Sequence, residues 1–270
     1  MPVIEHPEKI VSLEQFVALV APFPSNATVR PLFRGEGRVF STPLTPKIYR
    51  EEYRKHLAFP PVIGMGFAAA GPMPPEATEP STLEAFKRLA ISHIETIPAD
   101  DWAWLALAQH HGLATRLLDW TTNPLVALFF AVEQATEGAD SIVWRLVHKG
   151  SHIPQISIAP MHGKTLVSRK EAGDPFQIED ILVLGPPHLH RRLALQSAMF
   201  TVHPPGLSMV GDYSQGEVLK FVISGTKRPI LRWQLAELNL THASLFPGLD
   251  GIAKHLNEQG THASLRGAIP

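Results

Sequence analysis

Hydrophobic positions are densest between residues 102 and 133, where two apolar segments flank a short polar stretch. The first segment begins near Trp102 and predicts a helix, which Gly112 can close because glycine readily takes a positive φ. The second segment, LVALFFAV, is apolar on every side and therefore predicts a buried helix. Asn123 suits the N-cap of that helix and Pro124 its first position, because proline lacks the backbone donor that would be unpaired there.

Between these two helices, alternation over Thr115 to Trp120 predicts a strand. Successive side chains of a strand point to opposite faces, so Arg116 and Asp119 are expected to point opposite ways. The residues from Trp120 to Asn123 would then lie where the positive end of a buried helix meets a pocket, which favours phosphate or pyrophosphate.

The rest of the chain alternates between helical and extended patterns. A strand is expected at 28–34, as an edge or bulged strand because of Pro31. Residues 58–81 are rich in Pro, Gly and Ala, and we expect a lid or partner-contacting loop without regular structure. Further helices are expected at 11–20, 81–96, 229–238 and 249–258, and further strands at 141–147, 181–185, 199–203 and 217–223.

This order of elements predicts an α+β fold, a single domain with a split, mainly antiparallel sheet flanked by helices. We expect an N-terminal helical lead-in over 1–27, the domain over 28–260 and a tail over 261–270. The segments around Arg34, His110 to Asn123 and Gln196 are expected to converge on one cleft.

Composition narrows the function classes. The net charge of −1 and the pI near 6.9 argue against nucleic-acid binding through bulk charge. The absence of cysteine excludes disulfides, thiolate zinc sites and cysteine nucleophiles, and it fits a reducing compartment. The start of the chain lacks the pattern of a signal peptide and no apolar stretch is long enough to span a bilayer, so we expect a cytoplasmic protein with no membrane partner.

Four ordered blocks resemble the FRG domain family, which is named for a Phe-Arg-Gly triplet. The triplet is Phe33, Arg34 and Gly35; the second block is WLALAQHHGLATRLLDWTTNPLVALFFAV. The third is RLALQSAMFTVHP and the fourth is SLFPGLDGIAKHL. Together they span residues 32–256, which is most of the chain.

The order of these blocks is also similar to the three-part signature of ADP-ribosyltransferases. That resemblance implies an ADP-ribosyltransferase-like fold and a bacterial toxin or phage-defence effector that uses NAD, modifies a protein or nucleic acid and is held by an antitoxin. Arg34 would bind the NAD phosphates bidentately or contact the ribose, and Thr121 and Thr122 would shape the nicotinamide ribose pocket. The expected cofactor-binding residues are Arg34, Gly35, His110, Arg116, Trp120, Thr121, Thr122 and Asn123, and the expected catalytic residues are His111, Gln196 and Asp119.

Gln196 falls near the third position of the signature, where a transferase usually has a glutamate. A neutral amide can orient a group but supplies no negative charge, so Glu36, Asp119 or a histidine would have to supply it. The alternative is a non-catalytic module that binds a nucleotide, a nucleic acid or a protein.

Each candidate also has a structural interpretation. Arg116 and Asp119 could pair with neighbouring groups, Trp120 could serve packing, and Asn123 could be a helix cap alone. Adjacent histidines lie about 100° apart on a helix, so His110 and His111 do not form a chelating pair, and no metal site is expected. His188 and His190 fit a proline-flanked surface loop better than a metal site.

Overall fold

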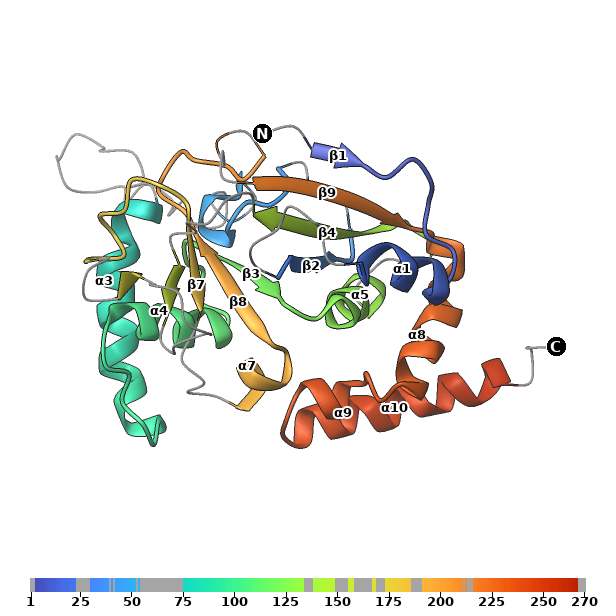
Figure 1. The fold of residues 1–270 in the computed structure, drawn as a ribbon. Helices are drawn as coiled ribbons and strands as arrows, with labels where there is room; N and C mark the ends of the chain where they lie inside the picture. The colour runs from blue at the N-terminus through green and yellow to red at the C-terminus, as the bar shows by residue number, and fades with distance from the viewer. Residues whose placement is uncertain are drawn as a thin grey trace, which may run out of the picture.

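The structure, a computed structural model, describes residues 3–22, 30–38, 40, 42–51, 53, 75–133, 138–148, 155–157, 167–168, 173–185, 191–210, 212 and 216–266. Within them, one sheet has nine strands in the order β1-β9-β4-β2-β3-β8-β7-β5-β6, with helices packed against it (Figure 1). The strands are β1 Val3–Glu5, β2 Leu32–Glu36, β3 Leu117–Thr121, β4 Ser141–His148, β5 Gln155–Ser157, β6 Val167–Ser168, β7 Leu182–Gly185, β8 Ala198–Val202 and β9 Gly216–Ile223. The α-helices are α1 Leu13–Val20, α3 Pro75–Ala90, α4 Asp101–His110, α5 Pro124–Glu133, α7 Arg191–Leu195, α8 Arg228–Glu237, α9 His242–Leu245 and α10 Leu249–Arg266, and the 3-10 helices are η1 Lys47–Tyr49, η2 Ile91–His93 and η3 Gly225–Lys227.

The sheet is mainly antiparallel, as the sequence predicts. Antiparallel pairs join β9 to β4, β4 to β2, β2 to β3, β3 to β8 and β8 to β7. Parallel pairs occur towards the two edges, between β1 and β9 and among β5, β6 and β7. The α+β class is confirmed.

The sheet is nearly interrupted between β2 and β3. These two strands are joined by a single residue pair, Phe33 with Thr121, whereas β2 pairs with β4 along all of its five residues. We call this narrow junction the seam. It divides the sheet into one half around β4 and β9 and another around β3, β7 and β8.

Among the described residues, three hydrophobic clusters pack against these halves of the sheet. One lies between the β4 and β9 half and helices α1, α5 and α8. Another covers the opposite face, where Trp120 and Trp144 pack with residues from the loops around Leu44 and Met209. The third lies between α3, α4 and the half formed by β3, β7 and β8. Figure 1 shows α3 and α4 at the β7 and β8 end and α5 under β2 and β4.

The helix over LVALFFAV is buried, as its uniform apolarity predicts. Its contact with β2 is so close that a Cβ added to Gly35 would lie 1.9 Å from the carbonyl oxygen of Ala127. Phe33 packs in the same core. Gly35 of the triplet therefore allows α5 to pack directly against the backbone of β2.

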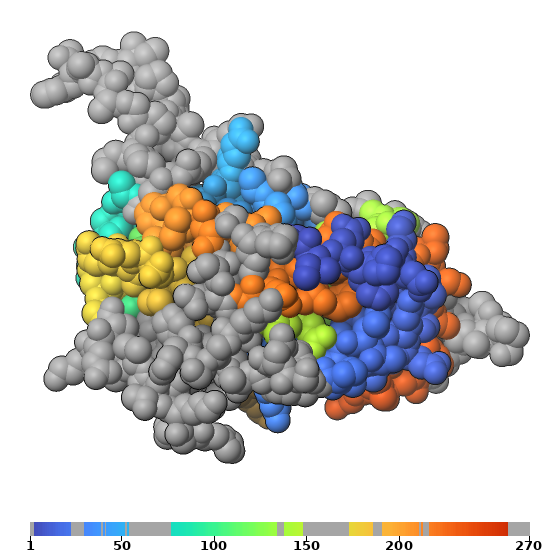
Figure 2. Space-filling view, turned by 45° about the horizontal axis from the view of Figure 1, so that its top comes forward, coloured from blue at the N-terminus to red at the C-terminus, as the bar shows by residue number. Residues whose placement is uncertain are grey.

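The N-terminal segment is part of the same fold. Ser12 accepts a hydrogen bond from the backbone of Gln15 at the N-cap of α1. Strand β1 pairs with β9 over Val3 to Glu5, and Figure 2 shows the blue N-terminal segment against the orange surface of the β9 region. The N-terminal segment and the rest of the domain therefore belong to one sheet.

Three expectations about the elements were wrong. Strand β2 is central, because Pro31 precedes the first paired residue and removes no ladder donor. The helix expected to start near Ser81 starts at Pro75 and contains Pro80, so the second part of the expected loop 58–81 is helical. Pro80 lies in the second turn, where it removes one intrahelical backbone hydrogen bond. Residues 58–74 lie outside the described part of the chain.

The third wrong expectation concerns the end of α10, which was expected near residue 258. Its apolar residues do not face inward: Leu249, Ile252 and Leu256 are exposed. The helix contacts the protein instead through Gly251, whose added Cβ would lie 1.9 Å from the carbonyl oxygen of Phe246, and through charged side chains. It also extends to Arg266, beyond the expected end.

Candidate functional site

A cavity of about 660 Å³ opens at the seam, which is within the usual size of ligand pockets. Its wall is formed by β2, β3, β8, the end of α4, the middle of α5 and the short helix α7. The three segments expected to converge therefore meet around one space. The lining residues are Phe33, Arg34, Gly35, Gln109, His110, His111, Gly112, Asp119, Trp120, Thr121, Phe130, Arg192, Leu193, Gln196, Ala198 and Phe200.

Arg34 bridges the seam. Its Nε donates to Oε1 of Glu36 at 3.0 Å, and its Nη1 donates to the backbone carbonyl oxygen of Asp119 at 2.9 Å. The other carboxylate oxygen of Glu36 accepts from Nε1 of Trp144 at 2.8 Å. Because Glu36 is 3% exposed and bonded at both oxygens, it cannot supply a carboxylate to a ligand.

Asp119 is the carboxylate that faces the cavity. Its side chain is 60% exposed, and Oδ2 lies 3.6 Å from Nη1 of Arg34. Nε2 of Gln109 donates to both carboxylate oxygens, at 3.3 and 3.1 Å, and Oε1 of Gln109 accepts from the hydroxyl of Thr115 at 2.8 Å. Gln109 is thereby held in one orientation, and it in turn positions Asp119.

The two histidines close α4 beside this carboxylate. The helix ends at His110, and Gly112 has a φ of +90°, as predicted from its place after the histidines. The two rings are in edge-to-face contact with centroids 5.0 Å apart. His110 is half-buried and His111 is exposed, so one faces the protein more than the other, and both line the cavity.

Gln196 lies on the opposite wall, in the turn between α7 and β8. Its side-chain Nε2 donates to the backbone carbonyl oxygen of Leu245 at 3.0 Å. The backbone carbonyl oxygen of Gln196 accepts from the hydroxyl of Thr121 at 2.7 Å. Ser197 follows in the left-handed region with φ +47°, a conformation that is rare for residues other than glycine. The turn ties β3 to α9 at the rim of the cavity.

Arg192, one turn before Gln196, was not predicted as a site residue. Its guanidinium carbon lies 4.3 Å from the ring centroid of Phe246. Burial lowers the pKa of Arg192, while the negative charge of Asp119 acts in the opposite direction. Arg192 belongs to the third block that resembles the family, but a five-residue helix is too short for a hydrophobic pattern to show which way Arg192 faces.

A buried polar chain fixes Trp120 behind the cavity. Nε1 of Trp120 donates to the hydroxyl of Thr201 at 2.9 Å, and that oxygen lies 2.9 Å from Nε2 of His203. His203 is fully buried, and this burial, the main cause, together with the positive charge of Arg34, lowers its pKa to about 3. The imidazole is therefore neutral, and it shares a hydrogen bond with the hydroxyl of Thr201. Sequence inspection missed both residues.

Arg116, which was expected among the cofactor-binding residues, is buried and is not among the residues that line the cavity. Its side chain is 2% exposed, and its Nε donates to the Glu79 carboxylate at 2.8 Å. Nη1 donates to the carbonyl oxygen of Pro175 at 3.1 Å. As predicted, Arg116 and Asp119 point to opposite sides, which is why one is sealed in the protein and the other reaches the cavity.

Two other expected ligand residues, Thr122 and Asn123, are not among the residues that line the cavity. The Asn123 side chain accepts from the backbone of Leu125 at 3.0 Å and so caps α5, as predicted. The backbone donor of Asn123 bonds the hydroxyl of Thr121 at 3.0 Å. Side chains of the protein therefore satisfy two backbone donors at the start of α5, where a phosphate was expected.

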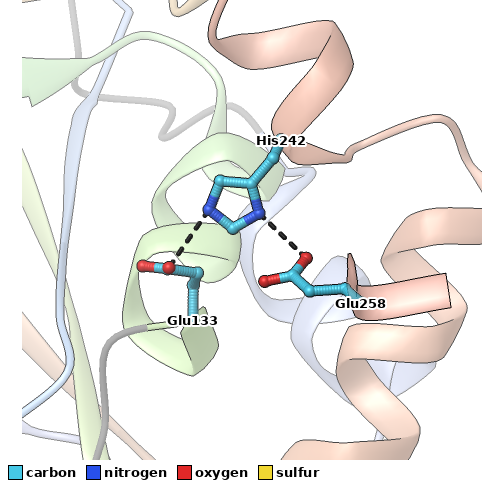
Figure 3. Close-up of side chains that lie close together, drawn as sticks. All are labelled: Glu133, His242 and Glu258. Carbon is cyan, nitrogen blue, oxygen red and sulfur yellow. Dashed lines mark hydrogen bonds and ion pairs between the residues drawn. The ribbon is translucent and has the colours of Figure 1, made fainter. Parts of the chain in front are cut away.

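One group of three side chains in the described part of the chain has metal-ligating chemistry: Glu133, His242 and Glu258, from α5, α9 and α10 (Figure 3). Nδ1 of His242 lies 2.9 Å from Glu258 and Nε2 lies 3.1 Å from Glu133. The two carboxylates therefore face opposite edges of the ring and do not converge on one point. Because Lys254 also binds Glu133 and Arg232 binds Glu258, the group is a network of ion pairs that fastens the C-terminal helices. His188 and His190 lie outside the described residues.

The fold and the site define an α+β domain with a ligand-sized cavity where its sheet divides. Residues 30–140 match the model of the FRG domain family, so the chain contains an FRG domain. No curated protein matches the chain, and no solved structure matches it. The matched range includes Arg34, the two histidines and Asp119, while Arg192 and Gln196 complete the cavity from outside it. No helix within the described ranges is long and apolar enough to cross a membrane.

Proposed function

We propose that the seam cavity binds NAD and that the protein transfers ADP-ribose from it to a protein or nucleic-acid acceptor. The observation that carries this proposal is the exposed carboxylate of Asp119, placed in the cavity between Arg34 and Gln109. Cleavage of the bond between ribose and nicotinamide develops positive charge on the ribose, and a fixed carboxylate stabilises such charge. Asp119 therefore takes the role that the neutral Gln196 cannot fill.

The other polar groups of the wall have matching roles. Nicotinamide leaves with the electron pair of the glycosidic bond, and the acceptor oxygen or nitrogen then bonds to the ribose carbon and loses a proton. His111 is exposed at the same cavity, and its imidazole can act as the general base that accepts that proton. Thr121 and Gln196 shape the wall opposite, and Trp120 is held by Thr201.

The test is release of nicotinamide from NAD by the purified protein, with a bacterial cell lysate as the source of acceptor. We expect release by the wild type and a loss of about a hundredfold in Asp119→Asn, because neutral asparagine keeps the shape but not the charge. Asp250→Asn, at an exposed position in the first turn of α10, is the matched control and should leave the rate unchanged. Equal rates in wild type and Asp119→Asn would show that this carboxylate has no catalytic role.

A binding module without turnover is the second candidate. It is favoured by Gln196, whose side-chain amide is engaged with the carbonyl oxygen of Leu245 and stands where transferases have a glutamate. In that case the folded wild type would bind ADP-ribose without releasing nicotinamide from NAD. Binding by calorimetry beside the turnover assay separates the two candidates.

For the cellular role we propose a toxin or phage-defence effector that a cognate antitoxin restrains. The resemblance to ADP-ribosyltransferases is the support for this role. Induced expression in bacterial cells should arrest growth with the wild type and not with Asp119→Asn. Growth arrest by both variants at equal expression would separate toxicity from NAD chemistry.

A further inference from the structure

Arg192 lies on the short helix α7 and lines the same cavity as Arg34. The proposed transfer of ADP-ribose gives Arg192 no role. Its position matters because a diphosphate carries two negative charges, and the family triplet contributes a single guanidinium to the cavity.

Arg34 cannot hold a diphosphate alone. Its Nε is bonded to Glu36 and its Nη1 to the carbonyl oxygen of Asp119. Nη2 has no hydrogen bond to any described residue, so only part of the guanidinium remains for a ligand. The buried Glu36 also neutralises much of the positive charge of Arg34.

Arg192 is held in a defined orientation at the cavity. Its guanidinium lies over the ring of Phe246, with the guanidinium carbon 4.3 Å from the centroid. The helix that carries it is tied to α9 by the bond from Gln196 to Leu245. The Asp119 carboxylate lies 3.6 Å from Nη1 of Arg34, and its charge also acts on Arg192, so this carboxylate interacts with both guanidinium groups.

We propose that Arg192 is a second anchor for a nucleoside diphosphate, which lies between Arg34 and Arg192. This inference rests on the proposed function and specifies its substrate class. A bound diphosphate takes over the electrostatic interaction that Asp119 has with Arg192. The Asp119 carboxylate is then available to the ribose next to the diphosphate, where the proposed chemistry needs it.

The test measures binding without turnover, using ADP-ribose and adenosine as probes in isothermal titration calorimetry. We expect Arg192→Gln to weaken ADP-ribose binding about ten- to a hundredfold, the range of a charge-assisted hydrogen bond, and to change adenosine binding less than about twofold. Arg192→Lys should recover part of the affinity, because it keeps the charge. Arg191→Gln is the matched control, since Arg191 is the exposed neighbour on the same helix and does not line the cavity.

Three outcomes overturn the inference: wild type that does not bind ADP-ribose, Arg192→Gln that binds it as wild type does, and Arg192→Gln that loses both ligands equally. The last result would identify Arg192 as a packing residue against Phe246. Thermal melting of each variant shows whether the fold is kept. If Arg192→Gln unfolds, the affinity of Arg192→Lys for ADP-ribose provides the test. Failure of the proposed function gives a different pattern, in which ADP-ribose binding still depends on Arg192 while NAD is not turned over.

Discussion

Arg34 donates from Nη1 to the backbone carbonyl oxygen of Asp119 at 2.9 Å, and so joins β2 to β3 where their backbone ladder has one residue pair. The same guanidinium holds the buried carboxylate of Glu36. Arg34 is therefore a structural bridge as well as a lining residue of the cavity. Loss of activity on its removal is informative only when the stability of the variant is known.

Arg34→Ala is expected to lower the free energy of unfolding by about 3 kcal/mol, because it leaves the buried Glu36 without a cation. Urea unfolding measures the change. Adding Glu36→Gln should recover part of the loss, since a neutral amide is less costly to bury than an unpaired carboxylate. A double variant that is less stable than Arg34→Ala would contradict the assignment of the cost to Glu36.

Gly35→Ala is expected to be among the most damaging small substitutions in the protein. The added Cβ would lie 1.9 Å from the oxygen of Ala127 and 2.7 Å from the nitrogen of Ala131, so α5 must move off the strand. We expect a loss of about 3 kcal/mol or more, at the upper end of overpacking effects, measured by thermal or urea unfolding. Adding Ala127→Gly should give no rescue, because the clashing atoms belong to the backbone; a rescue would show that the contact is between side chains.

Arg116→Ala tests whether this arginine is structural. Its side chain and that of Glu79 are both 2% exposed, and breaking a buried pair by removing one partner costs about 3–5 kcal/mol. Arg116→Ala should therefore melt at a much lower temperature but keep the wild-type affinity for ADP-ribose at temperatures where it is folded. If Arg116→Ala had wild-type stability but did not bind ADP-ribose, Arg116 would belong to the binding site.

The stability of the protein should depend on pH through His203. In the unfolded chain this histidine titrates near about 6.5, whereas burial lowers its pKa to about 3 in the folded protein. Between these values the unfolded chain binds a proton that the folded protein does not, so stability falls as the pH is lowered below about 6.5 and the loss levels off below about 3. Between pH 7 and 5 the loss is about 2 kcal/mol.

Urea unfolding at several pH values measures this dependence. His203→Gln should remove that part of the pH dependence, even if the variant is less stable at pH 7. His93→Gln, at an exposed position, is the control. An unchanged slope in His203→Gln would mean that another group causes the acid sensitivity.

Local signals in the sequence were sufficient for the elements around the site. Gly112 after the histidines, Asn123 before Pro124 and the uniform apolarity of LVALFFAV each have a direct physical consequence, and α4 and α5 begin and end as these residues indicate. The alternation over β3 also separated Arg116 from Asp119. These elements can be predicted because their caps, ends and apolar faces depend on residues that are close together in the sequence.

The features that were missed depend on contacts between distant segments. Nothing near Arg116 in the sequence reveals that Glu79 seals it, and nothing near Arg192 reveals that Phe246 supports it. In α10 the apolar residues Leu249, Ile252 and Leu256 follow helical spacing but are exposed. The glycine contact at Gly251 and the ion pairs of Glu258 determine the packing instead.

The most direct test of the account is a crystal structure of the wild-type protein with ADP-ribose. We predict density in the cavity at the seam, with the diphosphate within hydrogen-bonding distance of Arg34 and Arg192 and a ribose hydroxyl beside Asp119. A nucleotide bound elsewhere, for example at the start of α5, or protein crystals that show no nucleotide at saturating concentration, would contradict the assignment of this cavity.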